Sequence, residues 1–247
     1  MKIFLLFFFI FQTPSWAFTL VQKNSPKFPV NDVSIEFSID SCTNTGITIQ
    51  EWRDITEEAI NRYWNTVSSS ALRLKISGFS TASIAADIYS DAIAKAQTNS
   101  ILIGCSTNTT IFTTSTNVAS GRLNWSNPNQ AVVLINNISG SAAALMDREK
   151  KIILIAHELG HALGLGHATL ADALMYYSST NQSLKYLHKD DIDGITYLYP
   201  HHSPVSCSSI KDVQGDSGLL RSFFLSLFLG FFTLSLIHKL KRSLRFI

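Results

Sequence analysis

The sequence has no large excess of charge of either sign. Its 247 residues include 20 Lys and Arg against 18 Asp and Glu. Six of the basic residues lie in terminal segments that contain no acidic residue, namely Lys2, Arg221, Lys239, Lys241, Arg242 and Arg245. The rest of the chain therefore has 14 basic and 18 acidic residues, a net charge of −4. Proteins that bind nucleic acid carry a basic patch or stripe, so we expect no nucleic-acid partner.

Cysteines are also few, and the sequence has no internal repeat. There are three cysteines, so at least one is unpaired within the monomer that we expect. Cys42 and Cys105 each follow an apolar, strand-like run. A disulfide between them is our hypothesis for an oxidising compartment. Cys207 lies in a Ser-rich stretch, and the sequence leaves open whether it is free or serves as a processing or attachment site.

The first 17 residues are organised like a secretory signal. Lys2 supplies a basic start, residues 3–11 are apolar, and Ala17 supplies a small residue at the expected cleavage site. A buried strand or helix is a poor alternative for so apolar an N-terminus. We therefore expect residues 1–17 to be a signal peptide and the protein to be exported.

The other end, 219–247, combines an apolar run with a basic terminus. Because basic residues favour the cytoplasmic side of a membrane, the preceding domain is expected outside it. The run from Phe223 to Ile237 would reach only about 22 Å as a helix, short of a hydrocarbon core of about 30 Å. Two interpretations stay open, a membrane anchor and a tail that resembles the carboxy-terminal sorting signals of some bacterial surface proteins. Either would locate the protein at the cell surface or elsewhere outside the cytoplasm.

Between these ends we expect one globular domain at 18–200, followed by a linker at 201–218. Period-two alternation and short apolar runs predict strands, and apolar side chains at three- and four-residue spacing predict helices. The predicted strands are 33–39, 72–76, 85–89, 101–105 and 132–135. The predicted helices are 51–67, a helix that begins between 141 and 147 and ends at 163, and 190–199.

The eleven residues from His157 to His167 carry the strongest chemical signal. His157 and His161 are four residues apart, so on a helix both imidazoles leave one face and can hold a metal ion, with Glu158 beside them. Gly164 falls where a helix can stop, because glycine adopts a left-handed conformation without steric cost. The chain can then turn back to deliver His167 as a third ligand. Three nitrogen ligands leave a fourth position for water, as a catalytic zinc site requires.

This stretch resembles the zinc-binding consensus of the metzincin metalloproteases, and its details resemble the matrixin branch. Met175 lies where metzincins have the methionine turn that forms an apolar floor below the zinc ligands, which implies a supporting role for it. The Asp-Asp-Ile-Asp-Gly-Ile run from Asp190 to Ile195 is similar to the start of the last matrixin helix. The resemblance implies an α+β metzincin fold, with a twisted, mostly parallel sheet of about five strands, three main helices and a small C-terminal subdomain after the zinc helix.

The matrixin resemblance carries two further expectations. Residues 121–128 resemble the edge strand along which matrixin substrates align, so an extended peptide would pair there through its main chain. In matrixins the acids that open the last helix bind the methionine turn and the ammonium group of the mature N-terminus. Cleavage after Ala17 would make Phe18 the first residue, and an ion pair between its ammonium group and Asp190 or Asp191 is a hypothesis.

The sequence departs from the matrixin pattern in several places. No histidine precedes His157, and Trp125 stands on the edge strand where many matrixins have a ligand of a second zinc, so we predict a single zinc ion. No convincing acidic loop matches the calcium sites, which makes calcium doubtful. Cys42 does not resemble the propeptide cysteine that keeps many matrixins latent. Tyr177 replaces the proline that commonly follows the methionine turn, so the depth of the neighbouring pocket does not carry over.

The sequence thus predicts a zinc-dependent endopeptidase that acts on proteins or peptides outside the cytoplasm. In it, His157, His161 and His167 hold the metal, and Glu158 is the general base for hydrolysis by a metal-activated water. The alternative is a surface-attached binding or adhesion module that keeps the metzincin fold with little proteolysis. A damaged motif, above all at Glu158, would favour that alternative, and the motif is intact.

Overall fold

A computed structural model of the chain describes residues 18–22, 26–178 and 186–201. The predicted signal peptide, most of the predicted linker and the predicted tail lie outside the described residues. Among the residues that are described, no helix is long and apolar enough to cross a membrane. The fold described below is therefore that of the central domain.

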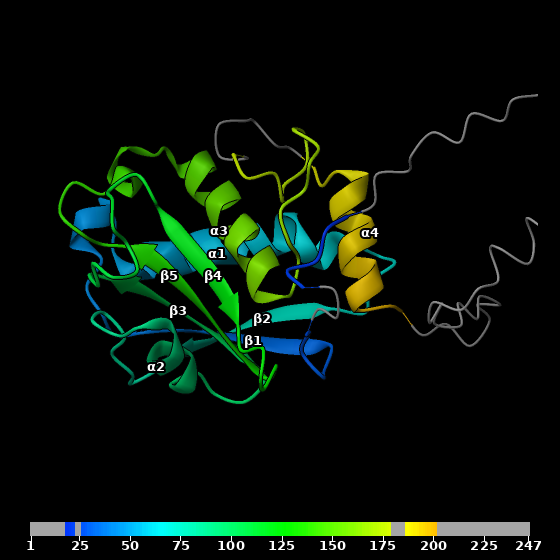
Figure 1. Cartoon of the computed structure of the whole chain (residues 1–247), viewed down its shortest axis with the longest axis horizontal. Helices are drawn as coiled ribbons and strands as arrows, with labels where there is room; N and C mark the ends of the chain where they lie inside the picture. The colour runs from blue at the N-terminus through cyan, green and yellow to red at the C-terminus, as the bar shows by residue number, and fades with distance from the viewer. Residues whose placement is uncertain (1–17, 23–25, 179–185, 202–247) are drawn as a thin grey trace, which may run out of the picture. The chain divides into compact units, whose positions relative to one another are not determined.

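The domain is built on a five-stranded sheet in the order β2-β1-β3-β5-β4 (Figure 1). The strands are β1 (Asp32–Phe37), β2 (Arg73–Phe79), β3 (Ser100–Ser106), β4 (Ala119–Leu123) and β5 (Gln130–Asn136). All neighbouring strands are parallel except β4, which pairs antiparallel with β5 and forms one edge of the sheet. The fold confirms the predicted α+β sheet of about five mostly parallel strands.

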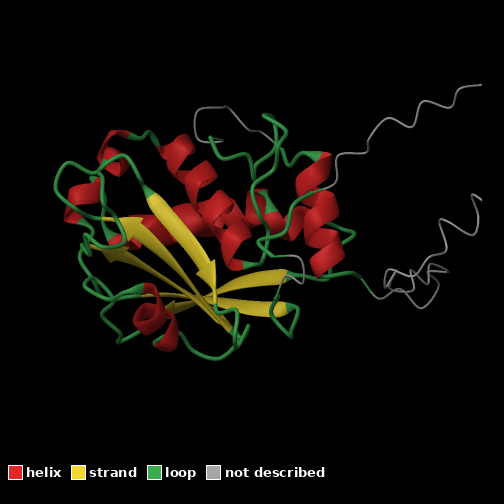
Figure 2. Ribbon diagram, in the orientation of Figure 1, coloured by secondary structure: helices red, strands yellow, loops and turns green. Residues whose placement is uncertain are grey.

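β3 and β5 are buried along almost their whole length because both faces of the sheet are covered (Figure 2). One face packs against α1 (Ile49–Arg62) and α3 (Arg148–Ala162), and it receives Ile101, Ile103 and Val133. The opposite face packs against α2 (Tyr89–Ala94) and receives Leu102, Val132 and Leu134. Successive side chains of β3 and β5 therefore serve different cores, as the pleat of a strand dictates.

The helices agree with the predicted segments apart from their ends. Thr48 caps the start of α1, and its hydroxyl accepts from Glu51 N (3.2 Å) in a capping box. The predicted continuation of α1 to residue 67 is a separate 3₁₀ turn, Trp64–Thr66. Two other 3₁₀ turns span Thr43–Thr45 and Ala142–Leu145. The last helix, α4 (Lys189–Leu198), follows α3 in the chain and belongs to the small C-terminal subdomain.

The predicted strand at 85–89 is wrong. Asp87 N donates to Ile84 O in a turn, and Tyr89 begins α2 instead. None of residues 85–89 is fully buried, and Ile88 is 49% exposed, so no side chain of this run holds it against the sheet. Burial of Ala92 and Ile93, one helical turn later, favours the helix.

The structure pairs Cys42 with Cys105 in a disulfide, as hypothesised. Cys42 follows β1 and Cys105 lies in β3, 63 residues later, with 5.3 Å between the Cα atoms. Cys207 lies outside the described residues. The bond joins the sheet to the segment that leads into α1.

Replacing both bonded cysteines with alanine should lower the free energy of unfolding by about 2–4 kcal/mol, because a closed loop of this length restricts the unfolded chain. Denaturant unfolding of the variant and of the wild type, each with and without reductant, measures the effect. Intact-mass measurement after alkylation reports whether the bond is present. Equal stability of the oxidised and reduced wild type would contradict the expectation.

Candidate metal centre

Helix α3 presents the predicted metal ligands at its C-terminal end. Asp147 caps its start by accepting from Lys150 N (2.8 Å). The helix ends at Ala162, and Gly164 adopts φ +108°, a backbone conformation that side chains disfavour. The chain reverses at this glycine and returns His167 to the same side as His157 and His161, as the spacing predicts.

The three histidines converge on one point. The Nε2 atom of His161 lies 3.1 Å from Nε2 of His157 and 3.1 Å from Nε2 of His167. Their ligand atoms all lie within 4.8 Å of one another, so the three side chains can hold one metal ion. In a tetrahedral zinc site with Zn–N bonds of about 2.0–2.1 Å, nitrogen ligands lie about 3.3 Å apart. The donor set and its spacing therefore suit zinc.

Backbone carbonyls set the tautomer of two of the ligands. His157 Nδ1 donates to Leu174 O (2.7 Å), and His161 Nδ1 donates to Leu165 O (2.8 Å). Because a carbonyl only accepts, each Nδ1 carries the proton and each Nε2 keeps a lone pair directed at the shared point. Burial lowers the pKa of both imidazoles to about 4, which favours the neutral form that binds metal.

Met175 lies directly against the ligand-bearing helix. A methyl group added to Gly160, which lies between His157 and His161 in the sequence, would come within 2.3 Å of Met175 Sδ. The methionine is 2% exposed. Only glycine at position 160 allows the helix and the methionine to approach so closely, and the role of Met175 as an apolar floor stays a prediction.

Asp191 connects α4 to the methionine turn. Its carboxylate accepts hydrogen bonds from Leu174 N (2.8 Å), Met175 N (2.9 Å) and His188 N (3.1 Å). The carbonyl of Leu174 in turn accepts from His157 Nδ1. An acid in the first turn of α4 thus orients the predicted metal ligand His157 through one peptide group.

Glu158 lies between the helix and the edge strand. Its side chain is 7% exposed, and Oε2 accepts from Gly121 N (2.6 Å) in β4. Burial raises the pKa of the carboxyl group. A methyl group on Gly121 would lie 1.9 Å from Glu158 O, so the absence of a side chain there lets α3 and β4 meet. The predicted general base therefore faces the edge strand.

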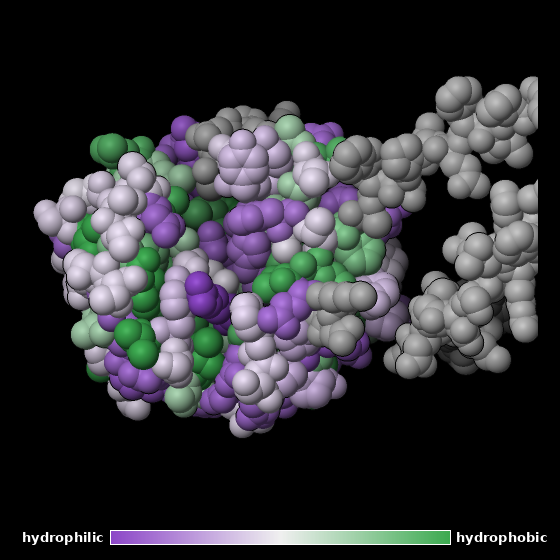
Figure 3. Space-filling model, viewed as in Figure 1, coloured by the Kyte–Doolittle hydropathy of each residue, from purple (hydrophilic) through white to green (hydrophobic). Residues whose placement is uncertain are grey.

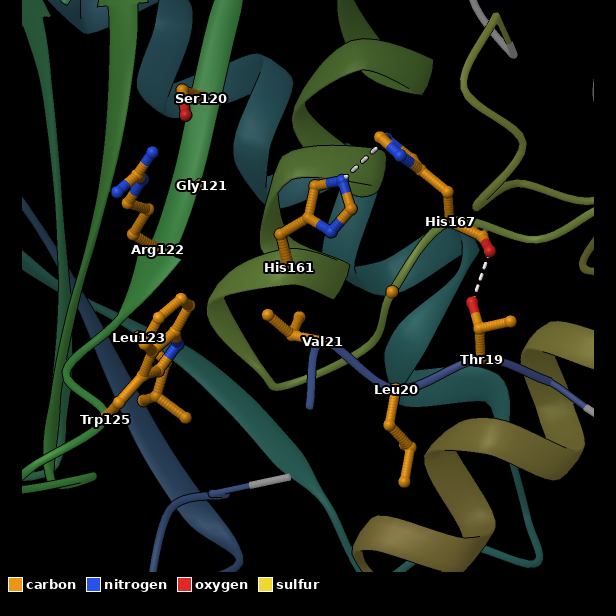
Figure 4. Close-up of a pocket in the computed structure, with 11 residues that line it drawn as sticks. Thr19, Leu20, Val21, Ser120, Gly121, Arg122, Leu123, Trp125, His161 and His167 are labelled. Atoms are coloured by element: carbon orange, nitrogen blue, oxygen red, sulfur yellow. Dashed lines mark hydrogen bonds between the residues drawn. The ribbon is translucent and has the colours of Figure 1, made fainter. Parts of the chain in front are cut away.

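Two cavities border the three histidines. One, of about 550 Å³, is lined by residues of α3 and by Met146 and Tyr177. The other, of about 410 Å³, lies between the end of β4 and residues 19–21, with His161 and His167 at one end (Figure 4). Figure 3 shows hydrophobic surface at this N-terminal segment, beside hydrophilic surface in the middle of the same face. Together the cavities form a cleft through the histidine site.

The contribution of the N-terminal segment was missed by the sequence analysis. Leu20 forms an antiparallel bridge with Leu165, and Gly166 N donates to Thr19 O (2.9 Å). The pairing is long-range, and residues 18–22 have no periodic pattern that could reveal it. The only signal is Gly166, where an added methyl group would come within 2.9 Å of the Leu20 backbone.

The sheet, the helix with its three histidines and the methionine beneath them define a metzincin-type catalytic domain. Residues 107–200 match the family model of the matrixins. The chain therefore carries a matrixin-like metzincin catalytic domain.

Several curated matrix metalloproteinases are similar to this chain over short segments. Stromelysin-1 of Mus musculus is 53% identical over 57 residues, which cover 21% of this chain and 12% of the relative. Matrix metalloproteinase-19 of Homo sapiens is 51% identical over 55 residues, covering 22% and 11%. Interstitial collagenase of Sus scrofa is 50% identical over 60 residues, covering 24% and 13%. The matched part thus spans only a small share of each relative.

Asp191→Asn should weaken metal binding by about 10–100-fold, because an amide cannot accept all three hydrogen bonds that orient Leu174 and, through it, His157. Competition with a fluorescent chelator measures the affinity of the wild type and the variant for zinc. Asp193→Asn, an exposed substitution on the same helix, is the matched control. Unchanged affinity in Asp191→Asn would show that the connection to His157 does not orient the ligand.

Proposed function

We propose that this protein is a zinc-dependent endopeptidase that hydrolyses internal peptide bonds of proteins or peptides outside the cytoplasm. The observation that carries the proposal is the convergence of three histidine nitrogens beside a buried glutamate, in a cleft bordered by the edge of a sheet. The matrixin match supports the same reaction class. The composition of residues 1–17 and 219–247 supports export and attachment or sorting at a membrane.

His157, His161 and His167 would hold the zinc ion through Nε2. Bound there, zinc would supply Lewis acidity, which lowers the pKa of water towards about 7 and polarises a peptide carbonyl. Leu174 and Leu165 keep two of the imidazoles in the tautomer that can bind it. The residues present therefore fit the ion that the family implies.

Glu158 has the position of a general base. Its carboxylate would accept a proton from the attacking water and pass it to the nitrogen of the leaving amine. Burial raises its pKa and so makes the carboxylate a better proton acceptor. The result is direct hydrolysis without a covalent acyl-enzyme.

The edge strand supports an extended peptide as the substrate. Within the described part of the chain β4 pairs only with β5, and Gly121 N on its other edge points at Glu158. A peptide that added to this edge would gain main-chain hydrogen bonds with little demand on its sequence. Its scissile bond would then lie beside the histidines.

Glu158→Gln should keep zinc bound but lower turnover by about 10²–10⁴-fold, since the amide cannot take up a proton. Cleavage of a denatured protein is followed by gel and mass spectrometry, and bound zinc by elemental analysis. A chelator should abolish cleavage by the wild type, and added zinc should restore it. His161→Ala should instead lose metal, because it removes a ligand.

These variants also separate the protease from a binding or adhesion module. Such a module would bind protein equally well with glutamate or glutamine at position 158 and would cleave nothing. Substantial proteolysis by Glu158→Gln would instead contradict the assigned base. Absence of cleavage by the zinc-loaded wild type would contradict the protease itself.

The structure favours Asp190 as the partner of a Phe18 ammonium group. Asp191 accepts from three backbone N–H groups, whereas Asp190, a residue that is 8% exposed, forms no side-chain hydrogen bond or ion pair among the described residues. Burial raises the pKa of Asp190. Phe18 already lies against α4, with 5.3 Å between its ring centroid and that of Tyr197. Cleavage after Ala17 would therefore create a cation on a residue that packs against the helix bearing Asp190.

A chain that begins at Phe18 should be more stable than one with two extra preceding residues by about 1.5–3 kcal/mol, as for a hydrogen bond to a charged group. The difference should disappear in Asp190→Asn. Thermal and denaturant unfolding of the four chains form a double-mutant cycle. Additive effects in this cycle would rule out the ion pair.

A further inference from the structure

The loop that joins β3 to β4 forms part of the cleft. Its last residues, Thr116, Asn117 and Val118, line the larger cavity together with Glu158. Residues 107–118 form no strand or helix, and they include no acidic residue, histidine or cysteine. The loop therefore lacks the carboxylate, imidazole and thiolate groups with which proteins most often bind metal ions. Hydrogen bonds and packing must hold it in place instead.

Asn136, the last residue of β5, supplies these hydrogen bonds from a fully buried position. Its Nδ2 atom donates to Thr114 O (3.0 Å) and to Asn117 O (2.6 Å), and its main-chain N donates to Val118 O (2.9 Å). Its Oδ1 atom accepts from Ile138 N (3.0 Å). Both donors and the acceptor of the amide are thus in use, which orients the side chain and ties the loop to the end of the sheet.

The amide of Asn136 begins where the strand pairing ends. The ladder between β4 and β5 runs to the pair of Ala119 with Ile135, and the bond from Asn136 N to Val118 O lies one step beyond it. The carbonyls of Thr114 and Asn117 have no strand beside them, and a partly buried carbonyl that loses its donor is costly. Loss of the amide should therefore release the loop while leaving β4 paired.

The same loop contacts the 3₁₀ turn at Ala142–Leu145. Ser115 O accepts from Ala142 N (2.9 Å), and Ala142 also lines the larger cavity. The loop consequently connects the end of β5 with the turn that precedes α3. A displacement of residues 114–118 would change the cavity at the loop and at this turn.

The direction of β4 decides which part of a substrate meets the loop. Gly121 lies at Glu158, and Ala119 and Asn117 precede it by two and four residues, about 7 Å and 13 Å along an extended chain. A peptide added antiparallel, the commoner pairing, has its carboxy-terminal part beside the start of β4. The third and later residues after the scissile bond would then lie beside residues 116–118.

We propose that Asn136 is a positioning residue that holds residues 114–118 as a rim for peptides extending three or more residues beyond the scissile bond. This assignment rests on the proposed endopeptidase function and adds a substrate class to it, namely peptides with a long carboxy-terminal side. Asn136 acts through the carbonyls of Thr114 and Asn117 and touches no reacting atom. Its removal should therefore weaken the binding of long peptides and leave the chemical step unchanged.

Asn136→Asp tests this role, because it keeps the shape of the side chain and the acceptor for Ile138 N but removes both N–H donors. A site cleaved in a denatured protein is made as two peptides, which end two or five residues after the bond. With the zinc-loaded full chain, the variant should raise KM for the long peptide about tenfold. KM for the short peptide and kcat for both should not change, a dependence on length that loss of folded protein cannot produce.

The matched control is Asn137→Asp, the same change at the next residue, which is 4% exposed. The Nδ2 atom of Asn137 donates to Ser41 O (2.8 Å), and Ser41 lines neither cavity of the cleft. This control should leave both KM values unchanged, and an effect equal to that of Asn136→Asp would overturn the positioning role. Asn136→Ser buries no charge and keeps one donor, so it should fold and raise KM for the long peptide by a smaller factor. Unchanged KM in both variants of Asn136 would overturn the role as well.

A binding measurement separates this role from the proposed function. The two peptides are titrated onto the zinc-loaded Glu158→Gln chain, with and without Asn136→Asp. Asn136→Asp should weaken binding of the long peptide about tenfold and leave the short one unchanged, and it should speed hydrogen exchange at residues 114–118. Equal binding of the long peptide to both chains would overturn the role, whatever the wild type cleaves. The expected binding without cleavage by the wild type would contradict only the endopeptidase.

Discussion

The hydrogen bonds of Asp191 are the contacts on which the geometry of the centre depends most. The methionine turn has no regular ladder of its own to hold it, so an acid from another helix satisfies the N–H groups of Leu174 and Met175. The opposite side of the same turn supplies the carbonyl that orients His157. A buried carboxylate costs desolvation unless its oxygens are bonded, and here three backbone donors offset that cost. The small C-terminal subdomain is thereby tied to the helix above it.

Two glycines allow neighbouring elements to pack closely against α3. Gly160 lets Met175 lie against α3, and Gly121 lets the edge strand meet the same helix at Glu158. In each case a methyl group would overlap a neighbouring atom, so the constraint is steric. The helix is consequently held from below by the turn and from the side by the sheet, which fixes the direction of the histidines that it bears.

The histidine motif and most strands of the sheet could be predicted from the sequence, because each depends on residues that are close together in the chain. The spacing of His157, Glu158 and His161 requires only a helix, and Gly164 requires only a reversal after it. The strands of the central sheet follow from short apolar runs such as Val132 to Ile135. The strand predicted at 85–89 is wrong because an apolar run does not show whether a neighbouring strand is available to pair with it. The wall formed by Thr19 to Val21 could not be predicted for a related reason, since it depends on pairing with residues more than 140 positions away.

Residues 18–21 contact two parts of the domain that are far from them in the sequence. Its backbone pairs with the residues between the helix and His167, and Leu165, its partner at Leu20, also accepts from His161. Its first residue packs on α4, the helix that contributes Asp191. A displacement of residues 18–21 would therefore disturb one wall of the cleft, the segment that carries His167 and the packing of α4 together. Residues 18–21 therefore contact both the segment that carries His167 and α4, so the two sides of this part of the cleft depend on one short stretch of chain.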